Sequence, residues 1–191
     1  MAPVHEFILG GQRSGKSRLA EERARQWLAA SPAHQAVFVA TAQAWDAEMQ
    51  ARILRHQRDR AERLPGMLTV EAPRALSEAI AQHSRADTLV VVDCLTLWLT
   101  HWLMPVEPVD ARRAAPDADA LADSLCATVR DAPGPLVLVG NEIGLGVIPL
   151  GREVRAFVDA LGRLNQAMAA TCGRVTWMAA GLPMPLKVPA A

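Results

Sequence analysis

The sequence predicts an α/β fold of three layers, in which a mainly parallel sheet is flanked by helices on both faces. Three observations lead to this expectation: several short apolar runs, helical patterns between them, and a glycine-rich turn after the first run. Strands that are apolar throughout are typical of parallel strands buried on both faces. We expect residues 1–191 to form a single domain, because the length suits one domain and no repeat or linker divides the chain.

The predicted elements alternate along the chain. Strands rich in β-branched and other apolar residues are expected at 6–9, 36–40, 68–70, 88–93, 136–139 and 174–178. Helical patterns are expected at 16–29 and 46–63, and Pro73 is expected to open a third helix. The segment from Pro105 to Ala120, rich in Pro, Ala and Asp, predicts a surface loop before an acidic helix.

Composition excludes several classes of protein. Lys plus Arg and Asp plus Glu are both 20, so no overall positive field favours nucleic acid or an anionic membrane as a partner. No signal peptide is evident at the amino terminus, and the apolar segment Leu95–Met104 is too short to span a bilayer, so we expect a cytoplasmic protein. Cys94, Cys126 and Cys172 are widely spaced and are expected to be reduced, apolar core residues.

A phosphate-binding loop is the most specific motif of the chain. The pattern G-x-x-x-x-G-K-S falls between the first predicted strand and the first helix, and consists of Gly10, Gly11, Gln12, Arg13, Ser14, Gly15, Lys16 and Ser17. Backbone N–H groups of such a loop surround phosphate oxygens at the start of a helix. We expect Lys16 to reach the β- and γ-phosphates and the Ser17 hydroxyl to bind Mg²⁺.

Asp93 ends the most apolar strand of the sequence, at the edge of the sheet where ligands of parallel sheets bind. A carboxylate in this position of a chain with a phosphate loop favours a Mg²⁺ ligand. The alternative is that Asp93 only caps the helix that follows.

A second distinctive region follows the strand at 36–40. Asp46 is a plausible N-cap for a polar helix, and helical spacing places Met49, Ile53, His56 and Arg60 on one face. A neutral imidazole can attack an α-phosphorus and expel pyrophosphate, with arginines neutralising the phosphate oxygens. The pattern leaves two interpretations of His56 open, a nucleophile or a partly buried structural histidine.

Three motifs in the same order make the chain resemble a known family. They are the phosphate loop, the segment from Val39 through His56 to Arg60, and Asn141–Pro149, with Arg163–Gln166 in a late helix. The sequence thereby resembles the bifunctional adenosylcobinamide kinase/adenosylcobinamide-phosphate guanylyltransferase family of cobalamin biosynthesis, over nearly its whole length.

The resemblance implies two consecutive reactions. The family phosphorylates the hydroxyl of adenosylcobinamide with ATP or GTP, then attaches GMP from GTP to adenosylcobinamide phosphate through a guanylylated histidine, which matches His56. Beyond the phosphate loop, nucleotide contacts would fall on Ala40, Thr41, Ala42, Gln57, Arg58, Asp59, Arg60, Glu71 and Asp93. Lys16 would act in catalysis with His56, Mg²⁺ would bind Ser17 and Asp93, and the protein would be a homotrimer.

Several interpretations remain open. The loop Asn141–Pro149 is expected either to contact a ligand or to shape a subunit boundary. Trp98 and Trp102 are expected in the core or at a subunit interface rather than as a platform for the corrin ring. The alternative functions are a P-loop kinase for a small molecule, in which His56 is structural, and a binding protein that senses GTP.

Overall fold

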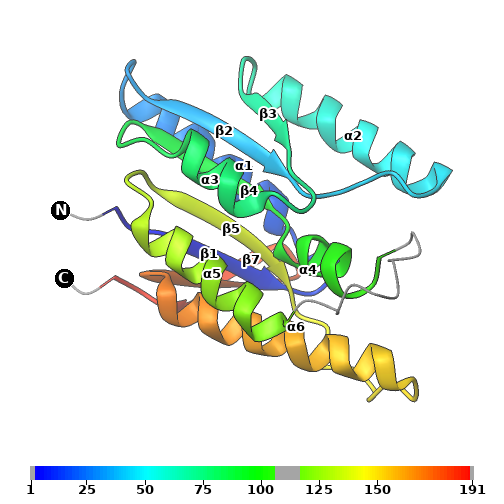
Figure 1. Cartoon of the computed structure of the whole chain (residues 1–191). Helices are drawn as coiled ribbons and strands as arrows, with labels where there is room; N and C mark the ends of the chain where they lie inside the picture. Colours follow the sequence, from blue (N-terminus) through cyan, green and yellow to red (C-terminus); the bar gives the residue numbers. More distant parts are fainter. Residues whose placement is uncertain (1–2, 106–116, 190–191) are drawn as a thin grey trace.

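A seven-stranded sheet runs through the part of the chain that the computed structural model describes, residues 3–105 and 117–189 (Figure 1). The strand order is β3-β2-β4-β5-β1-β6-β7. In chain order the strands are β1 Glu6–Gly10, β2 Gln35–Ala40, β3 Leu68–Glu71, β4 Thr88–Asp93, β5 Leu136–Asn141, β6 Arg174–Ala179 and β7 Leu182–Lys187. All neighbouring pairs are parallel except β6 and β7.

Helices cover both faces of this sheet, which confirms the three-layer α/β fold (Figure 1). They are α1 Lys16–Ala30, α2 Ala47–Arg63, α3 Leu76–His83, α4 Leu95–Leu103, α5 Ala118–Asp131 and α6 Arg152–Thr171. Successive residues of a strand point to opposite faces, so Phe7 joins the core under α3 to α6 and Ile8 joins the core under α1. Both side chains are fully buried, as the unbroken apolar pattern of the strand predicts.

The carboxyl ends of the parallel strands form one edge, opposite the edge at which the chain termini lie (Figure 1). Strand β5 separates β4 from β1, with Asp93 beside Val139 and Gly10 beside Asn141. This register brings the ends of β1, β4 and β5 together, although their residues are far apart in sequence.

Strand β7 was not predicted. It contains Pro183 and Pro185, which argue against a central strand because proline donates no ladder hydrogen bond. The strand is antiparallel at the sheet edge and exposed along its length, where proline is tolerated.

Helix α3 begins at Leu76 and not at Pro73, so the expected start is wrong by three residues. The backbone N–H of Ala72 still donates to the carbonyl of Ala40, 2.8 Å away. This hydrogen bond ties the chain to the carboxyl end of β2 just before Pro73. The helix starts only after the turn that follows.

Other expectations on the core hold. Cys94, Cys126 and Cys172 are free and buried, and Trp98 is a core residue whose indole N–H donates to the Arg74 carbonyl. The expected loop at Pro105–Ala120 lies mostly outside the described residues. Among the helices described, none combines the length and apolar character needed to cross a bilayer.

Candidate active site

The phosphate loop folds as its glycines require. Gly15 precedes α1 with a φ of 100°, in the left-handed region, and Arg13 also has a positive φ, of 55°. A Cβ atom on Gly10 would lie 2.4 Å from the carbonyl oxygen of Met178, so only glycine fits between β1 and β6. The loop therefore turns its backbone toward the start of a helix, the arrangement that binds phosphate.

The side chain of Lys16 is buried and reaches back across the loop. Its Nζ donates to the carbonyl of Gly11 at 2.6 Å and lies 3.5 Å from Ser14 Oγ. These contacts keep the ammonium group beside the loop, where phosphate oxygens would be neutralised.

The hydroxyl of Ser17 donates to Asp93 Oδ2 at 2.6 Å, which joins the start of α1 to the end of β4. Two hard oxygen donors at one point suit Mg²⁺, which takes one or two protein oxygens and completes its shell with phosphate and water. The N-cap residue of α4 is Cys94, not Asp93, and its side chain makes no capping hydrogen bond, so the capping alternative for Asp93 is wrong. No group of three or more His, Cys, Asp or Glu side chains suited to a metal occurs among the residues described.

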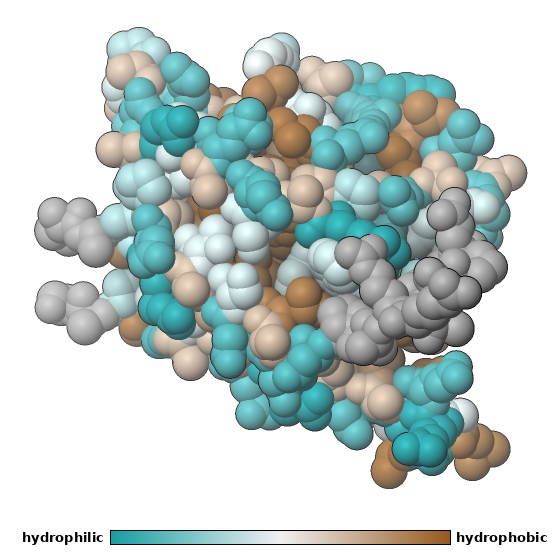
Figure 2. Space-filling view, in the orientation of Figure 1, coloured by the Kyte–Doolittle hydropathy of each residue, from teal (hydrophilic) through white to brown (hydrophobic). Residues whose placement is uncertain are grey.

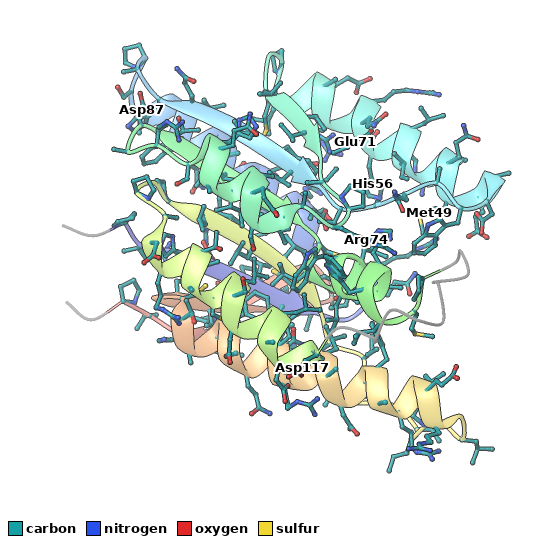
Figure 3. The ribbon with its side chains drawn as sticks, in the orientation of Figure 1. Met49, His56, Glu71, Arg74, Asp87 and Asp117 are labelled. Carbon is teal, nitrogen blue, oxygen red and sulfur yellow. The ribbon has the colours of Figure 1, made fainter. Side chains whose placement is uncertain are left out.

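Helix α2 begins as the sequence predicts, since Asp46 accepts a hydrogen bond from the Met49 N–H at 2.7 Å. Met49, Ile53, His56 and Arg60 all line one cavity of about 540 Å³ with the phosphate loop. Figure 3 shows Met49 and His56 on the side of α2 that faces the carboxyl edge of the sheet. His56 is exposed to solvent in this cavity, so it is not partly buried as the structural alternative expects.

Arg60 supplies a buried positive charge at the carboxyl end of α2. Its guanidinium lies 3.7 Å from the ring centroid of Phe38, and Nη2 donates to Thr69 Oγ1 at 3.2 Å. Burial lowers the pKa of Arg60, while the charges of Glu21 and Asp93 oppose that shift. An arginine pKa starts so high that the group stays charged at neutral pH.

Thirteen of the predicted site residues line this cavity together. They are Gln12, Arg13, Ser14, Gly15, Lys16, Ser17, Ala40, Ala42, His56, Gln57, Asp59, Arg60 and Asp93.

The other predicted residues do not line the cavity: Gly10, Gly11, Thr41, Arg58 and Glu71. Thr41 is fully buried, and its hydroxyl accepts from the Cys94 N–H at 2.8 Å and donates to the Cys94 carbonyl at 2.7 Å. Its side chain therefore holds the ends of β2 and β4 together. Glu71 is exposed at the end of β3 (Figure 3).

Sequence reasoning missed part of the lining, including Arg18, Glu21, Phe38, Arg55, Arg63, Cys94 and Leu97. Phe38 could have been found from its central place in the strand before α2, and Glu21 from its place one turn after the phosphate loop. Asn141 also lines the cavity, which favours ligand contact for the first residue of the loop Asn141–Pro149.

A loop for phosphate, a carboxylate beside a hydroxyl and a histidine on a facing helix define a nucleotide-dependent transferase. The family model described as CobU, cobinamide kinase/cobinamide phosphate guanyltransferase, matches residues 6–186. The chain belongs to this family.

Similar proteins agree with this assignment. The chain is 46% identical over 184 residues to the bifunctional adenosylcobalamin biosynthesis protein CobP of Pseudomonas aeruginosa, covering 96% of this chain and 98% of the relative. It is 33% identical over 187 residues to the bifunctional CobU proteins of Escherichia coli and of Salmonella typhimurium, covering 95% of this chain and 98% of each relative.

A solved structure shares the fold alone. The PH0250 protein of Pyrococcus horikoshii superposes with a TM-score of 0.56 at 8% identity, over 97% of this chain and 86% of that one.

Proposed function

We propose that this protein phosphorylates adenosylcobinamide with a nucleoside triphosphate and then transfers GMP from GTP to adenosylcobinamide phosphate through a guanylylated His56. The observation that carries the proposal is that His56 and the phosphate loop line the same cavity. Membership of the cobinamide kinase/guanyltransferase family supports both activities.

In the first reaction the hydroxyl oxygen of the substrate attacks the γ-phosphorus, and the bond from that phosphorus to the β-phosphate oxygen breaks. The nucleoside diphosphate leaves, and the hydroxyl proton passes to solvent. The phosphate loop and Lys16 hold the donor and neutralise charge on its oxygens.

In the second reaction a ring nitrogen of His56 attacks the α-phosphorus of GTP, and pyrophosphate leaves. An oxygen of the corrinoid phosphate then attacks the same phosphorus and breaks its bond to nitrogen. This step restores the imidazole and gives adenosylcobinamide-GDP. Arg60, a buried cation that lines the same cavity as His56, would neutralise phosphate oxygens in this reaction.

We propose GTP as the guanylyl donor and ATP or GTP as the phosphoryl donor, with Mg²⁺ held by Ser17 and Asp93. The 2.6 Å contact between Ser17 Oγ and Asp93 Oδ2 supports that pair. When bound, the cation supplies positive charge to the phosphates. Gly10, Gly11, Thr41, Arg58 and Glu71 remain proposed nucleotide contacts, and for Thr41 the backbone is the group available because the hydroxyl is already bonded.

We also propose that the protein assembles as a homotrimer, with residues 1–191 as one domain in each subunit. Leu145, Val147, Ile148 and Leu150 are 77–98% exposed, which supports burial against another subunit. Figure 2 shows hydrophobic surface at the tip where α6 begins. Nucleic acid is not proposed as a partner, and the cytoplasmic location stays a prediction. Sedimentation tests the assembly: wild type should sediment as a trimer and Leu150→Glu as a smaller species. A monomeric wild type would contradict the proposal.

Two other functions compete with this proposal. A kinase that uses the same loop would leave His56 without a chemical role, and a GTP-sensing binding protein would transfer nothing. The exposure of His56 inside the phosphate cavity favours the bifunctional enzyme over both.

Turnover separates the three functions. The purified protein is incubated with adenosylcobinamide, γ-labelled ATP or GTP, and α-labelled GTP, and the corrinoid products are separated by mass. The bifunctional enzyme gives both the phosphate and the GDP ester. Formation of the phosphate alone would indicate a kinase, and binding of GTP without any product would indicate a sensor.

A further inference from the structure

Asn141 lies at the end of the strand between the phosphate loop and Asp93. Strand β5 lies between β1, which leads into the phosphate loop, and β4, which ends at Asp93. Asn141 pairs with Gly10, and Asp93 pairs with Val139 two residues earlier on β5. Asn141 therefore extends about 7 Å beyond the level of Asp93 along the strand direction, at roughly 3.3 Å per residue. Asn141 is one of the residues that line the cavity.

The backbone of Asn141 is held on both sides. Its N–H donates to Thr96 Oγ1 on α4 at 2.9 Å, and its carbonyl accepts from Asn165 Nδ2 on α6 at 3.2 Å. The next N–H, of Glu142, donates to the Gly10 carbonyl at 3.1 Å. Contacts from α4, α6 and β1 thus fix the backbone around Asn141.

The two clamping side chains are themselves buried, Thr96 at 8% and Asn165 at 5% exposure. Asn165 Oδ1 has no hydrogen-bond partner in the described part of the chain, so burying this amide carries a cost. An apolar side chain at position 165 would avoid this unpaired buried oxygen, but it could not donate a hydrogen bond to the Asn141 carbonyl. The buried side chains of Thr96 and Asn165 thus both serve to position Asn141.

Asn141 and His56 lie on opposite sides of Asp93. Helix α2 follows β2, which neighbours β4 on one side, and β5 neighbours β4 on the other. His56 would therefore reach a bound nucleotide from the side of β2. Asn141 adjoins Gly10 of the phosphate loop, where Lys16 would hold the terminal phosphates.

From this geometry we infer that the Asn141 side-chain amide donates a hydrogen bond to the γ-phosphoryl group while it is transferred to the substrate hydroxyl, and that Thr96 is its positioning residue. In that step charge lies on the three outer oxygens of the γ-phosphorus, and a neutral N–H donor held in place stabilises it without reorganisation. The attack of His56 on the α-phosphorus leaves these oxygens on the departing pyrophosphate, so it needs Asn141 much less. This inference rests on the proposed function.

The test compares the two reactions in one variant. Asn141→Ala keeps the backbone bonds to Thr96 and Asn165 and removes only the side-chain amide. We expect kcat for adenosylcobinamide phosphorylation to fall about 100-fold, the usual effect of losing one such donor. Labelling of His56 by α-labelled GTP is expected to change less than about threefold, and it shows that the variant is folded. Gln82→Ala, an exposed amide on α3, is the matched control and is expected to change neither rate.

A second pair of variants tests the positioning role of Thr96. Thr96→Val removes the acceptor of the Asn141 N–H and should lower the phosphorylation rate but not His56 labelling. Thr96→Ser keeps the hydroxyl and should keep the wild-type phosphorylation rate. An equal fall of phosphorylation and labelling in Asn141→Ala, or no fall in phosphorylation, would overturn the inference alone. A wild-type protein that phosphorylates no corrinoid would overturn the proposed function and this inference with it.

Discussion

The two walls of the cavity are built differently. The phosphate-loop wall follows β1, whose residues are buried between parallel neighbours, and the β6–β7 turn supports it through the bond from Gly181 N–H to the Ser14 carbonyl, 3.0 Å long. Helix α2, the opposite wall, exposes most of its residues. Its attachments gather near its ends, where Arg60 and Arg63 contact Phe38 and Glu21 at one end and Trp45 packs on His101 at the other.

This difference matches the division of labour that we propose. Both reactions need the triphosphate gripped in one place, which a wall buried in the sheet provides. Only one of them needs His56, and a helix with few buried contacts is free to adjust its position at low cost. Substitutions in the phosphate loop and Lys16 should therefore impair both reactions, and substitutions in α2 should impair guanylyl transfer selectively.

The largest effect is expected from His56→Ala. Removal of the nucleophile should lower GMP transfer at least about 1,000-fold, while phosphorylation stays within about threefold of wild type. Separate assays of the two products check this split. His83→Ala, on α3, is the control for loss of a histidine outside the cavity lining. Loss of phosphorylation together with transfer would mean that His56 serves folding or substrate placement.

Lys16→Ala should impair both reactions, by about 100-fold each, because one ammonium group neutralises the phosphates of both donors. Steady-state rates of phosphorylation and of His56 labelling provide the measurement. Lys187→Ala is the matched control, since Lys187 lies on β7 and bonds only to carbonyls of α6 among the described contacts. An unchanged labelling rate in Lys16→Ala would show that the guanylyl donor binds elsewhere.

Arg60→Ala should slow GMP transfer by about 10-fold and lower the free energy of unfolding by about 1–2 kcal/mol. The variant loses the contact with Phe38 and the bond to Thr69 that attach α2 to the sheet. Urea denaturation and the transfer assay measure the two effects. As a control, Arg130→Ala changes an exposed arginine on α5 that does not line the cavity. Equal effects of the two substitutions would contradict the anchoring role of Arg60.

The smallest effect concerns pH. His101 is buried, its Nε2 lies 2.7 Å from the Thr41 carbonyl, and burial lowers its pKa from the usual 6.5. Because the unfolded chain binds a proton at His101 more readily than the folded chain, protonation of this residue favours unfolding. The stability that comes from keeping His101 neutral is complete above about pH 6.5 and is lost as the pH falls below that value.

His101→Gln keeps a donor for the Thr41 carbonyl. When the pH is lowered from 7.5 to 5.5, the free energy of unfolding should fall less in this variant than in wild type. The difference in the free energy of unfolding should be about 1 kcal/mol or less. Denaturation midpoints at the two pH values measure it. His5, whose pKa is also lowered by burial, is present in both proteins and cancels. An equal loss in both proteins would show that His101 does not titrate in this range.

The sequence predicted the parts of the site that local pattern determines. The phosphate loop, the cap at Asp46 and the face that carries His56 depend on neighbours within a few residues. Asp93 was predicted because a carboxylate after an apolar strand has a known place in a parallel sheet.

The rest depends on contacts distant in sequence. The hydroxyl of Thr41 is bonded to Cys94, and the backbone of Asn141 is held by Thr96 and Asn165. No spacing rule reveals such pairs. Strand β7 escaped prediction for another reason, because its prolines are compatible with a strand only at a sheet edge.

The most direct test of the account is the covalent state of His56 after incubation with GTP labelled at the α-phosphate. Peptide mass spectrometry of the protein, quenched in base, should find one GMP on the peptide that contains His56, labile to acid and absent from His56→Ala. Label that stays non-covalent, or that is found on another residue, would contradict the claim that the two walls form one site for both reactions.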